Sequence, residues 1–102
     1  MNYLPYNIKN EGVQVLYFYT QWMPFYTKTT ALLKSNEEKY KWEHFAIDCD
    51  LFKDLCKKHR VNCVPVVIVT DNGVEVGRLT GVVLASALKA FYIKIFRSKN
   101  GK

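Results

Sequence analysis

Three cysteines are the residues of this 102-residue chain with the clearest capacity for chemistry. Cys49, Cys56 and Cys63 follow one another at intervals of seven residues. Thiol–disulfide exchange needs a thiolate that attacks a disulfide sulfur and a second thiol that resolves the mixed intermediate. An odd number of cysteines without a visible signal peptide favours a reducing compartment, in which thiols stay free. We therefore expect a cytoplasmic location and free thiols.

A metal site would need ligand pairs that this sequence lacks. Cys56 and His59 lie three residues apart on one face of an expected helix, and Cys49 and Cys63 are the further sulfur ligands. Structural zinc sites usually combine two such closely spaced pairs, and neither a Cys-x-x-Cys nor a His pair is present. We expect no metal and no cofactor.

Length and composition predict one globular domain over residues 1–102. Hydrophobic residues make up 49% and charged residues 24% of the chain, which excludes a disordered segment. The longest apolar runs, Val13–Tyr19 and Val64–Val69, are far shorter than the ~20 residues of a membrane span. The N-terminal residues have neither a basic start nor the apolar run of a signal peptide.

Positive charge is concentrated in the last quarter of the chain. The net charge is +6, and residues 76–102 carry all of this excess because they contain six Lys and Arg and no acid. The simplest interpretation is a solvated helix face, since cations suit a helix C-terminus. The alternative is an anchor for acidic partners, RNA or anionic lipid. No nucleic-acid-binding motif accompanies the charge, so we expect no specific nucleic-acid binding.

The elements that must position these residues alternate between strands and helices. Val13–Tyr19 has the β-branched and aromatic composition of a buried central strand, and Asn72-Gly73 is a strong hairpin signal. The expected elements are strands at Val13–Tyr19, Trp42–Asp48, Val66–Val69 and Val74–Leu79, and helices at 24–40, Asp50–His59 and 83–96.

This order, β-α-β-α-β-β-α, predicts an α/β fold of three layers. The first strand, helix and second strand form a parallel crossover unit, and an antiparallel hairpin and a covering helix follow. A mixed four-stranded sheet would then lie between helices on both faces. The core would span residues 13–96, with residues 97–102 as a frayed basic tail.

Several segments resemble landmarks of the thioredoxin superfamily at their proper spacing. Residues 17–22 (Tyr-Phe-Tyr-Thr-Gln-Trp) resemble its junction between strand and active-site helix, and residues 62–65 (Asn-Cys-Val-Pro) resemble its cis-proline loop. Residues 72–81 resemble its hairpin and closing glycine, and residues 47–61 are most like a protein disulfide isomerase domain. The resemblance implies a thioredoxin-like α/β/α sandwich.

The resemblance also has consequences for the sheet. Only twelve residues precede Val13, so we expect the family's first strand to be missing or vestigial. The strand Trp42–Asp48 would then be a sheet edge, available for a homodimer unless the N-terminal segment covers it.

The chain departs from the family at the redox motif. The expected Cys-x-x-Cys after Trp22 reads Met23-Pro24-Phe25-Tyr26, so Met23 and Tyr26 take the places of the two cysteines. The family's buried carboxylate falls on Tyr17, and its helix-kinking proline on Ala31. A thioether has no ionisable proton, and a phenol with a pKa of about 10 forms no disulfide. Dithiol catalysis is therefore not expected at this position.

The resemblance also implies a peptide groove beside the cis-proline, which does not depend on the redox cysteines. There the residue before the proline pairs through its backbone with an extended peptide, which requires no cysteine. The groove residues would be Trp22, Met23, Phe25, Tyr26, Cys63, Val64 and Pro65. The alternative is that the cis-proline only shapes the start of its strand, and that Met23 and the aromatic residues simply pack.

The cysteines offer a second hypothesis. Cys63, two residues before Pro65, is the candidate reactive thiol, unless it is a small buried hydrophobe. Cys49 and Cys56 match a second cysteine pair of isomerase domains, which implies a disulfide if Cys49 lies outside the helix. We expect this pair to be reduced in a reducing compartment.

The predicted function is therefore a non-catalytic, thioredoxin-like module that binds a protein or an extended peptide through the groove and its aromatic patch. The alternative is a thiol–disulfide redox protein or sensor that uses Cys63 or the pair of Cys49 and Cys56.

Overall fold

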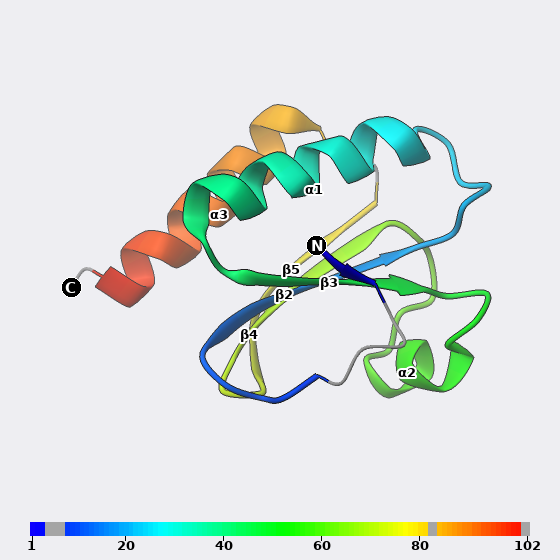
Figure 1. The fold of residues 1–102 in the computed structure, drawn as a ribbon, viewed down its shortest axis with the longest axis horizontal. Coiled ribbons are helices and arrows are strands. Elements are labelled where there is room, and N and C mark those ends of the chain that lie inside the picture. The colour runs from blue at the N-terminus through cyan, green and yellow to red at the C-terminus, as the bar shows by residue number, and fades with distance from the viewer. Residues whose placement is uncertain (4–7, 82–83, 101–102) are drawn as a thin grey trace.

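The computed structural model describes residues 1–3, 8–81 and 84–100, the side chains of residues 99 and 100 excepted. A mixed sheet lies between α1 and α3 on one face and α2 on the other (Figure 1). The elements are β1 (Asn2–Tyr3), β2 (Val13–Tyr19), α1 (Tyr26–Tyr40), β3 (Glu43–Asp48), α2 (Lys53–Lys58), β4 (Val66–Asp71), β5 (Val74–Thr80) and α3 (Ala85–Asn100).

The sheet has the strand order β1-β3-β2-β4-β5. β2 pairs in parallel with β3 and antiparallel with β4, and β4 pairs antiparallel with β5. The thioredoxin-like sandwich expected from the sequence is therefore confirmed, with one strand more than the four expected.

The extra strand, β1, corrects the expected sheet edge. It is vestigial rather than missing, since its two residues pair in parallel with Phe45 and Ala46 of β3. The N-terminal segment thus covers β3 at these two residues, which is the exception stated for the expected edge strand Trp42–Asp48, and β1 is the outer strand of the sheet. A two-residue strand carries no periodic signal, which is why composition alone did not predict it.

Two apolar clusters hold the helices to the sheet. One lies under α1 and α3 and includes Tyr17, Leu33, Leu88 and Tyr92, and the other lies over α2 and includes Phe18 and Phe45. β2 contributes to both because alternate residues of a strand point to opposite faces. This explains why Val13–Tyr19 reads as a continuous apolar run.

Several element boundaries differ from those expected. α1 begins at Tyr26 rather than Pro24 because Phe25 has a left-handed backbone conformation, with φ of 61°. α2 is shorter than 50–59, and α3 continues to Asn100, so residues 97–100 of the expected tail are helical. Leu84 lies before α3, while Val83 and residues 101–102 lie outside the described residues. Among the described residues, no helix is long and apolar enough to cross a membrane.

Candidate functional site

Four loops meet at one edge of the sheet, and they carry the residues that the sequence singled out. β2 and β3 are parallel and end at the same edge, and β4, which is antiparallel to β2, begins there. β5 runs back and ends at that edge too. The loops after β2, after β3, before β4 and after β5 are therefore neighbours, at the right-hand side of Figure 1.

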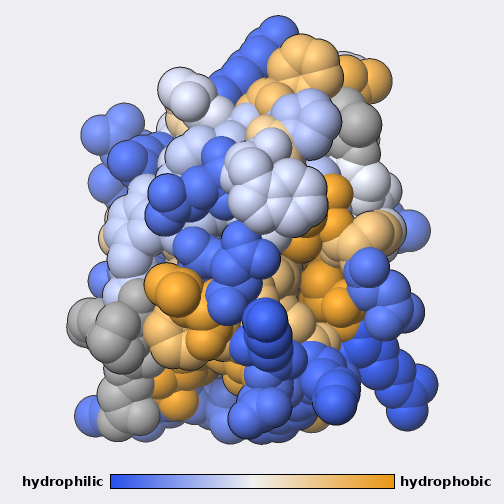
Figure 2. All heavy atoms as spheres, turned by 90° about the vertical axis from the view of Figure 1, so that its right-hand side faces the viewer, coloured by the Kyte–Doolittle hydropathy of each residue, from blue (hydrophilic) through white to orange (hydrophobic). Residues whose placement is uncertain are grey.

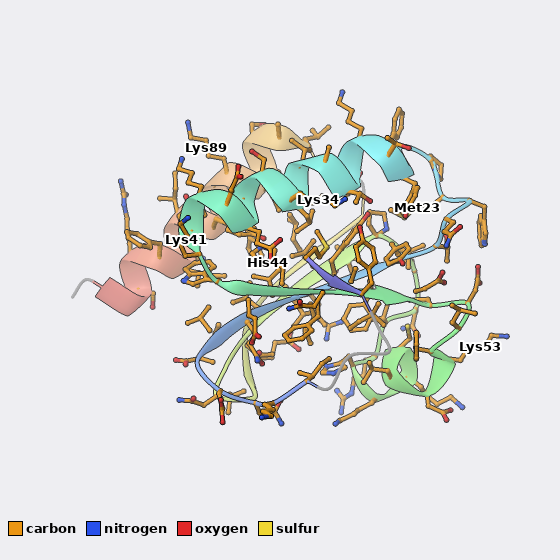
Figure 3. All side chains as sticks on the ribbon, in the orientation of Figure 1. Met23, Lys34, Lys41, His44, Lys53 and Lys89 are labelled. Carbon is orange, nitrogen blue, oxygen red and sulfur yellow. The ribbon has the colours of Figure 1, made fainter. Side chains whose placement is uncertain are left out.

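The side chains of the loop between β2 and α1 differ in burial. Met23 is only 4% exposed and belongs to the apolar cluster under α1, where Figure 3 places it between that helix and the sheet. Trp22 is 74% and Phe25 65% exposed. The expectation that Met23 lines an open groove is therefore wrong, whereas both aromatic neighbours are accessible.

The loop is closed by backbone hydrogen bonds. The Met23 amide donates to the Thr20 carbonyl oxygen at 3.3 Å, and the Thr29 amide donates to the Phe25 carbonyl oxygen at 2.9 Å. This tight turn directs Met23 inward. The backbone conformation of Phe25 is unusual for a side chain of its size.

Tyr26 belongs to a stack of tyrosines that runs from this loop into the core. The rings of Tyr26 and Tyr19 are 5.4 Å apart, and those of Tyr19 and Tyr17 are 5.3 Å apart. The Tyr17 hydroxyl lies 3.0 Å from the Thr30 hydroxyl oxygen. Burial raises the pKa of Tyr17 to about 12, so this phenol stays protonated and does not replace a carboxylate as a proton shuttle at neutral pH.

Trp22 is held from the neighbouring loop after β3. Its indole N–H donates to an Asp50 carboxylate oxygen at 2.9 Å. The Asp50 amide in turn donates to the buried Asp48 carboxylate at 2.9 Å. No local pattern signals the role of Asp50, because this contact joins residues 28 positions apart. The exposed indole is thus fixed at one end while its ring remains in solvent.

The loop before β4 carries the proline. The Val64–Pro65 peptide bond is cis, and the Pro65 carbonyl oxygen accepts a hydrogen bond from the Gly81 amide at 3.0 Å. Strand pairing begins only at Val66. Within the described part of the chain, no hydrogen bond engages the backbone amide or carbonyl of Val64.

The cysteines differ in accessibility. Cys63 is exposed, Cys49 is half-buried and Cys56 is buried, so the alternative in which Cys63 is a buried hydrophobe is wrong. The Cys49 side chain packs against the apolar cluster that contains Cys56, and each of the two thiols affects the pKa of the other. Burial raises the pKa of both thiols, so both stay protonated at neutral pH. Among the described residues, no group of three or more His, Cys, Asp and Glu is placed to hold a metal ion.

Further apolar side chains are exposed in these loops. Leu51, next to Asp50, is 72% exposed, and Leu84, three residues after Gly81, is 61% exposed. Sequence reasoning missed both because it assigned them to helices. We define the apolar patch as Trp22, Phe25, Leu51 and Leu84. Figure 2, which looks onto this side, shows hydrophobic residues distributed among hydrophilic ones.

A comparison with protein families matches residues 4–94 to the family model described as Thioredoxin. No curated protein sequence matches significantly. The fold is similar to several solved structures. Oxidised thioredoxin from Plasmodium falciparum has a TM-score of 0.83 at 20% identity, with 93% of this chain and 97% of that chain covered.

Two further structures agree with this comparison. The germline-specific thioredoxin Deadhead from Drosophila melanogaster has a TM-score of 0.77 at 22% identity, over 83% of this chain and 82% of that one. The N21Q mutant thioredoxin from Halobacterium salinarum has a TM-score of 0.75 at 21% identity, over 88% and 76%. At these identities the likeness concerns the fold.

Proposed function

Because this chain belongs to the thioredoxin family, we propose that it is a redox-inactive thioredoxin-fold domain that binds an extended segment of a partner protein. The observation that carries the proposal is the backbone of Val64 beside cis Pro65, which makes no hydrogen bond to the residues that the structure describes and lies at the same end of the sheet as the exposed Trp22 and Phe25.

The backbone of Val64 supplies the affinity in this proposal. An extended peptide would pair with its amide and carbonyl groups, as a strand added to an existing one does. Backbone hydrogen bonds do not distinguish one peptide sequence from another. Specificity would therefore come from contacts of peptide side chains with the apolar patch. Trp22 suits this role because the bond to Asp50 already fixes its indole, which lowers the entropy lost on binding.

Redox inactivity at this site follows from the residues that take the place of the cysteines. Met23 is buried in the core and has no thiol, and Tyr26 packs in the tyrosine stack. Neither side chain can form or resolve a mixed disulfide. The aromatic side chains beside the cis-proline can still contact a peptide. Because neither position carries a cysteine, such binding would involve no thiol–disulfide exchange.

Selection from a random peptide library displayed on phage tests the binding proposal. The wild-type protein is the target, and Trp22→Ala/Phe25→Ala is used for counter-selection. Selected synthetic peptides should bind the wild type about 30-fold more tightly than the double variant, because exposed aromatic anchors dominate such interfaces. N-methylation of alternate peptide amides should weaken binding only at those positions that pair with Val64.

The matched control is Val74→Ala/Val76→Ala, which removes two exposed apolar side chains from β5. This variant should bind the selected peptides as the wild type does. Equal binding by all three proteins would contradict the assignment of the site. Acceleration of insulin reduction by dithiothreitol above the uncatalysed rate would contradict redox inactivity.

The contact between Cys49 and Cys56 favours a second candidate function, an accessory dithiol. Oxidised glutathione would accept the two electrons. A first thiolate displaces one glutathione thiolate to form a mixed disulfide, and the second thiolate displaces the other glutathione. The products are one intramolecular disulfide and two reduced glutathione molecules.

Mass spectrometry in a Cys63→Ser background tests this candidate. Loss of two hydrogens with no bound glutathione supports the dithiol, whereas retention of two alkylatable thiols contradicts it. The raised pKa of both thiols predicts that oxidation accelerates at alkaline pH.

A further inference from the structure

A second surface lies where α1 ends beside α3. It combines four exposed cations with one exposed aromatic ring. We define this basic face as Lys39, Lys41, Lys89, Phe96 and Arg97. Figure 3 shows Lys41 and Lys89 at the left-hand side, opposite the loops of the apolar patch.

Ring contacts place these residues together. The Phe96 ring lies 5.7 Å from the Tyr40 ring and 6.5 Å from the Trp42 ring, so α3 touches the segment that contains Lys41. The Lys39 ammonium lies 5.5 Å from the centre of the Tyr40 ring. Phe96 and Arg97 follow Lys89 by seven and eight residues, which is about two helical turns, so they share its side of α3.

The charge of this face is uncompensated. Among the described residues, none of its four cations forms an ion pair. The nearby Glu37 carboxylate is occupied by the Met1 amine at 2.6 Å, and Glu43 accepts a hydrogen bond from Gln14 at 3.0 Å. Glu38 is the remaining acid of the last turns of α1. The face therefore has a net positive charge.

The requirements of the fold account for this arrangement only in part. Lys41 has a left-handed backbone conformation, with φ of 62°, at a helix C-cap where glycine is the favoured residue. Lys89 lies near the N-terminal end of α3, where the helix dipole disfavours a cation. The dipole of α1 favours the positive charge of Lys41, whereas Lys89 gains no such stabilisation from α3. Four exposed cations without an ion-pair partner among the described residues would suit an external anion.

We propose that the basic face binds the surface of a membrane that contains anionic lipid. The cations would lie among acidic headgroups, and Phe96, which is 44% exposed, would enter the interfacial layer between them. A polybasic cluster of four charges with an aromatic side chain is a combination that favours such a surface.

The ring contacts favour lipid over single-stranded nucleic acid. Binding of bases needs free aromatic faces on which they stack. Here the ring of Trp42 stacks on those of Tyr40 and Tyr92, at 5.1 and 5.6 Å. Lys39 lies over the ring of Tyr40. The stacked rings form a rigid base for Phe96 rather than a platform for nucleotides.

Co-sedimentation of the full chain with unilamellar vesicles tests the proposal. Vesicles of phosphatidylcholine with 30% phosphatidylserine are compared with pure phosphatidylcholine at 100 mM and 500 mM KCl. Binding is expected only to the anionic vesicles and only at the lower salt concentration. Because each basic residue contributes roughly a fivefold factor, Lys41→Gln/Lys89→Gln/Arg97→Gln should lower partitioning about 100-fold.

The matched control is Lys53→Gln/Lys57→Gln/Lys58→Gln, which lowers the net charge of +6 by the same three units on α2, at the other face of the sheet. Retention of vesicle binding by this variant supports the basic face, and an equal loss would show that net charge alone drives binding. Phe96→Ser should lower partitioning roughly fivefold at constant charge. Circular dichroism checks the fold of each variant.

Two other outcomes would overturn the proposal. One is equal binding of the wild type to neutral and anionic vesicles. The other is a single-stranded RNA oligonucleotide that binds more tightly than the anionic vesicles do and is sensitive to the same triple variant. If the triple variant fails to fold, the double variant Lys89→Gln/Arg97→Gln takes its place. This double variant should lower partitioning onto anionic vesicles about 25-fold.

Discussion

His44 is a titratable side chain that the fold buries and holds by two hydrogen bonds. It is fully buried between α3 and the sheet. Its Nδ1 lies 2.8 Å from the Trp42 carbonyl oxygen and therefore carries the proton, while Nε2 accepts from the Tyr92 hydroxyl at 2.7 Å. Burial lowers the pKa of His44, which keeps the ring neutral at physiological pH.

This environment predicts a pH-dependent stability. The pKa of His44 is lower in the folded than in the unfolded state, so the unfolded state binds more protons as the pH falls below about 6.5. The free energy of unfolding should therefore decrease over this range, by at most about 1.4 kcal/mol per pH unit for each titrating group. Urea unfolding of wild type and His44→Gln between pH 7.5 and 5 measures the slope.

His59 is a second histidine that contributes to this pH dependence. Its pKa is also lowered, by burial and by the neighbouring Lys58, so part of the slope should remain in His44→Gln and disappear in the double variant with His59→Gln. The same slope in wild type and His44→Gln would contradict the prediction.

Cysteine accessibility gives a second prediction at the scale of residues. Cys63 is exposed, whereas burial raises the pKa of Cys49 and Cys56. Iodoacetamide should therefore modify Cys63 at least 10-fold faster than either other thiol at pH 7.5, since the thiolate is the reacting form. Peptide mapping by mass spectrometry measures the three rates. Comparable rates at all three sites would place Cys49 and Cys56 in a more open environment than described here.

Single side chains also mark the limit of sequence reasoning. The sequence placed Met23 and Trp22 in one groove, yet the turn after β2 buries Met23 and exposes Trp22. Which of two neighbouring apolar residues turns inward depends on the backbone of that turn. The bond from Trp22 to Asp50 depends on the packing of two loops, which no local pattern encodes.

At the scale of elements, the strongly periodic segments were predictable. β2 and the hairpin of β4 and β5 have the composition of buried strands and an Asn-Gly turn, and they appear where expected. The elements without such a pattern were not. β1 has only two residues and so no periodic pattern, and the polar last turn of α3 has no apolar residues to signal that the helix continues.

The C-cap of α1 gives a prediction at this scale. Lys41 adopts a left-handed conformation that costs an L-residue about 1 kcal/mol relative to glycine. Lys41→Gly should therefore raise the free energy of unfolding by about 1 kcal/mol, measured by urea denaturation. Lys39→Gly, inside the last turn of α1, is the control and should lower it by a similar amount. Loss of stability in Lys41→Gly would contradict the assigned backbone conformation.

The contact between β5 and α3 gives a second prediction at the scale of elements. A Cβ atom added at Gly77 would lie 3.0 Å from a ring carbon of Phe91 and 3.1 Å from the Ile95 methyl group. Gly77→Ala should cost about 1–3 kcal/mol of stability through overpacking. The double variant with Phe91→Leu should recover part of this loss, because the smaller side chain makes room. An unchanged unfolding midpoint in Gly77→Ala would indicate a wider spacing between α3 and β5.

At the scale of the whole molecule, the loops after β2 and β3, which carry most of the apolar patch, and the ends of α1 and α3 lie toward opposite ends of its longest dimension, which is 39 Å (Figure 1). Leu84 and Lys89, five residues apart at the start of α3, are the members by which the two surfaces come nearest to each other along the chain. Sites this far apart with no shared side chains usually act independently. A chain bound to a membrane through the basic face would present its peptide site away from the lipid.

Independence of the two ends can be measured directly. A selected peptide should bind vesicle-bound protein with a Kd within twofold of that for free protein, by fluorescence anisotropy of a labelled peptide. Trp22→Ala/Phe25→Ala should keep its vesicle binding, and the triple variant of the basic face should keep its peptide binding. Release of the protein from vesicles by the peptide would require the two ligands to compete for one surface. One of the two assignments would then be wrong, and the variant that abolishes both activities would identify the shared surface.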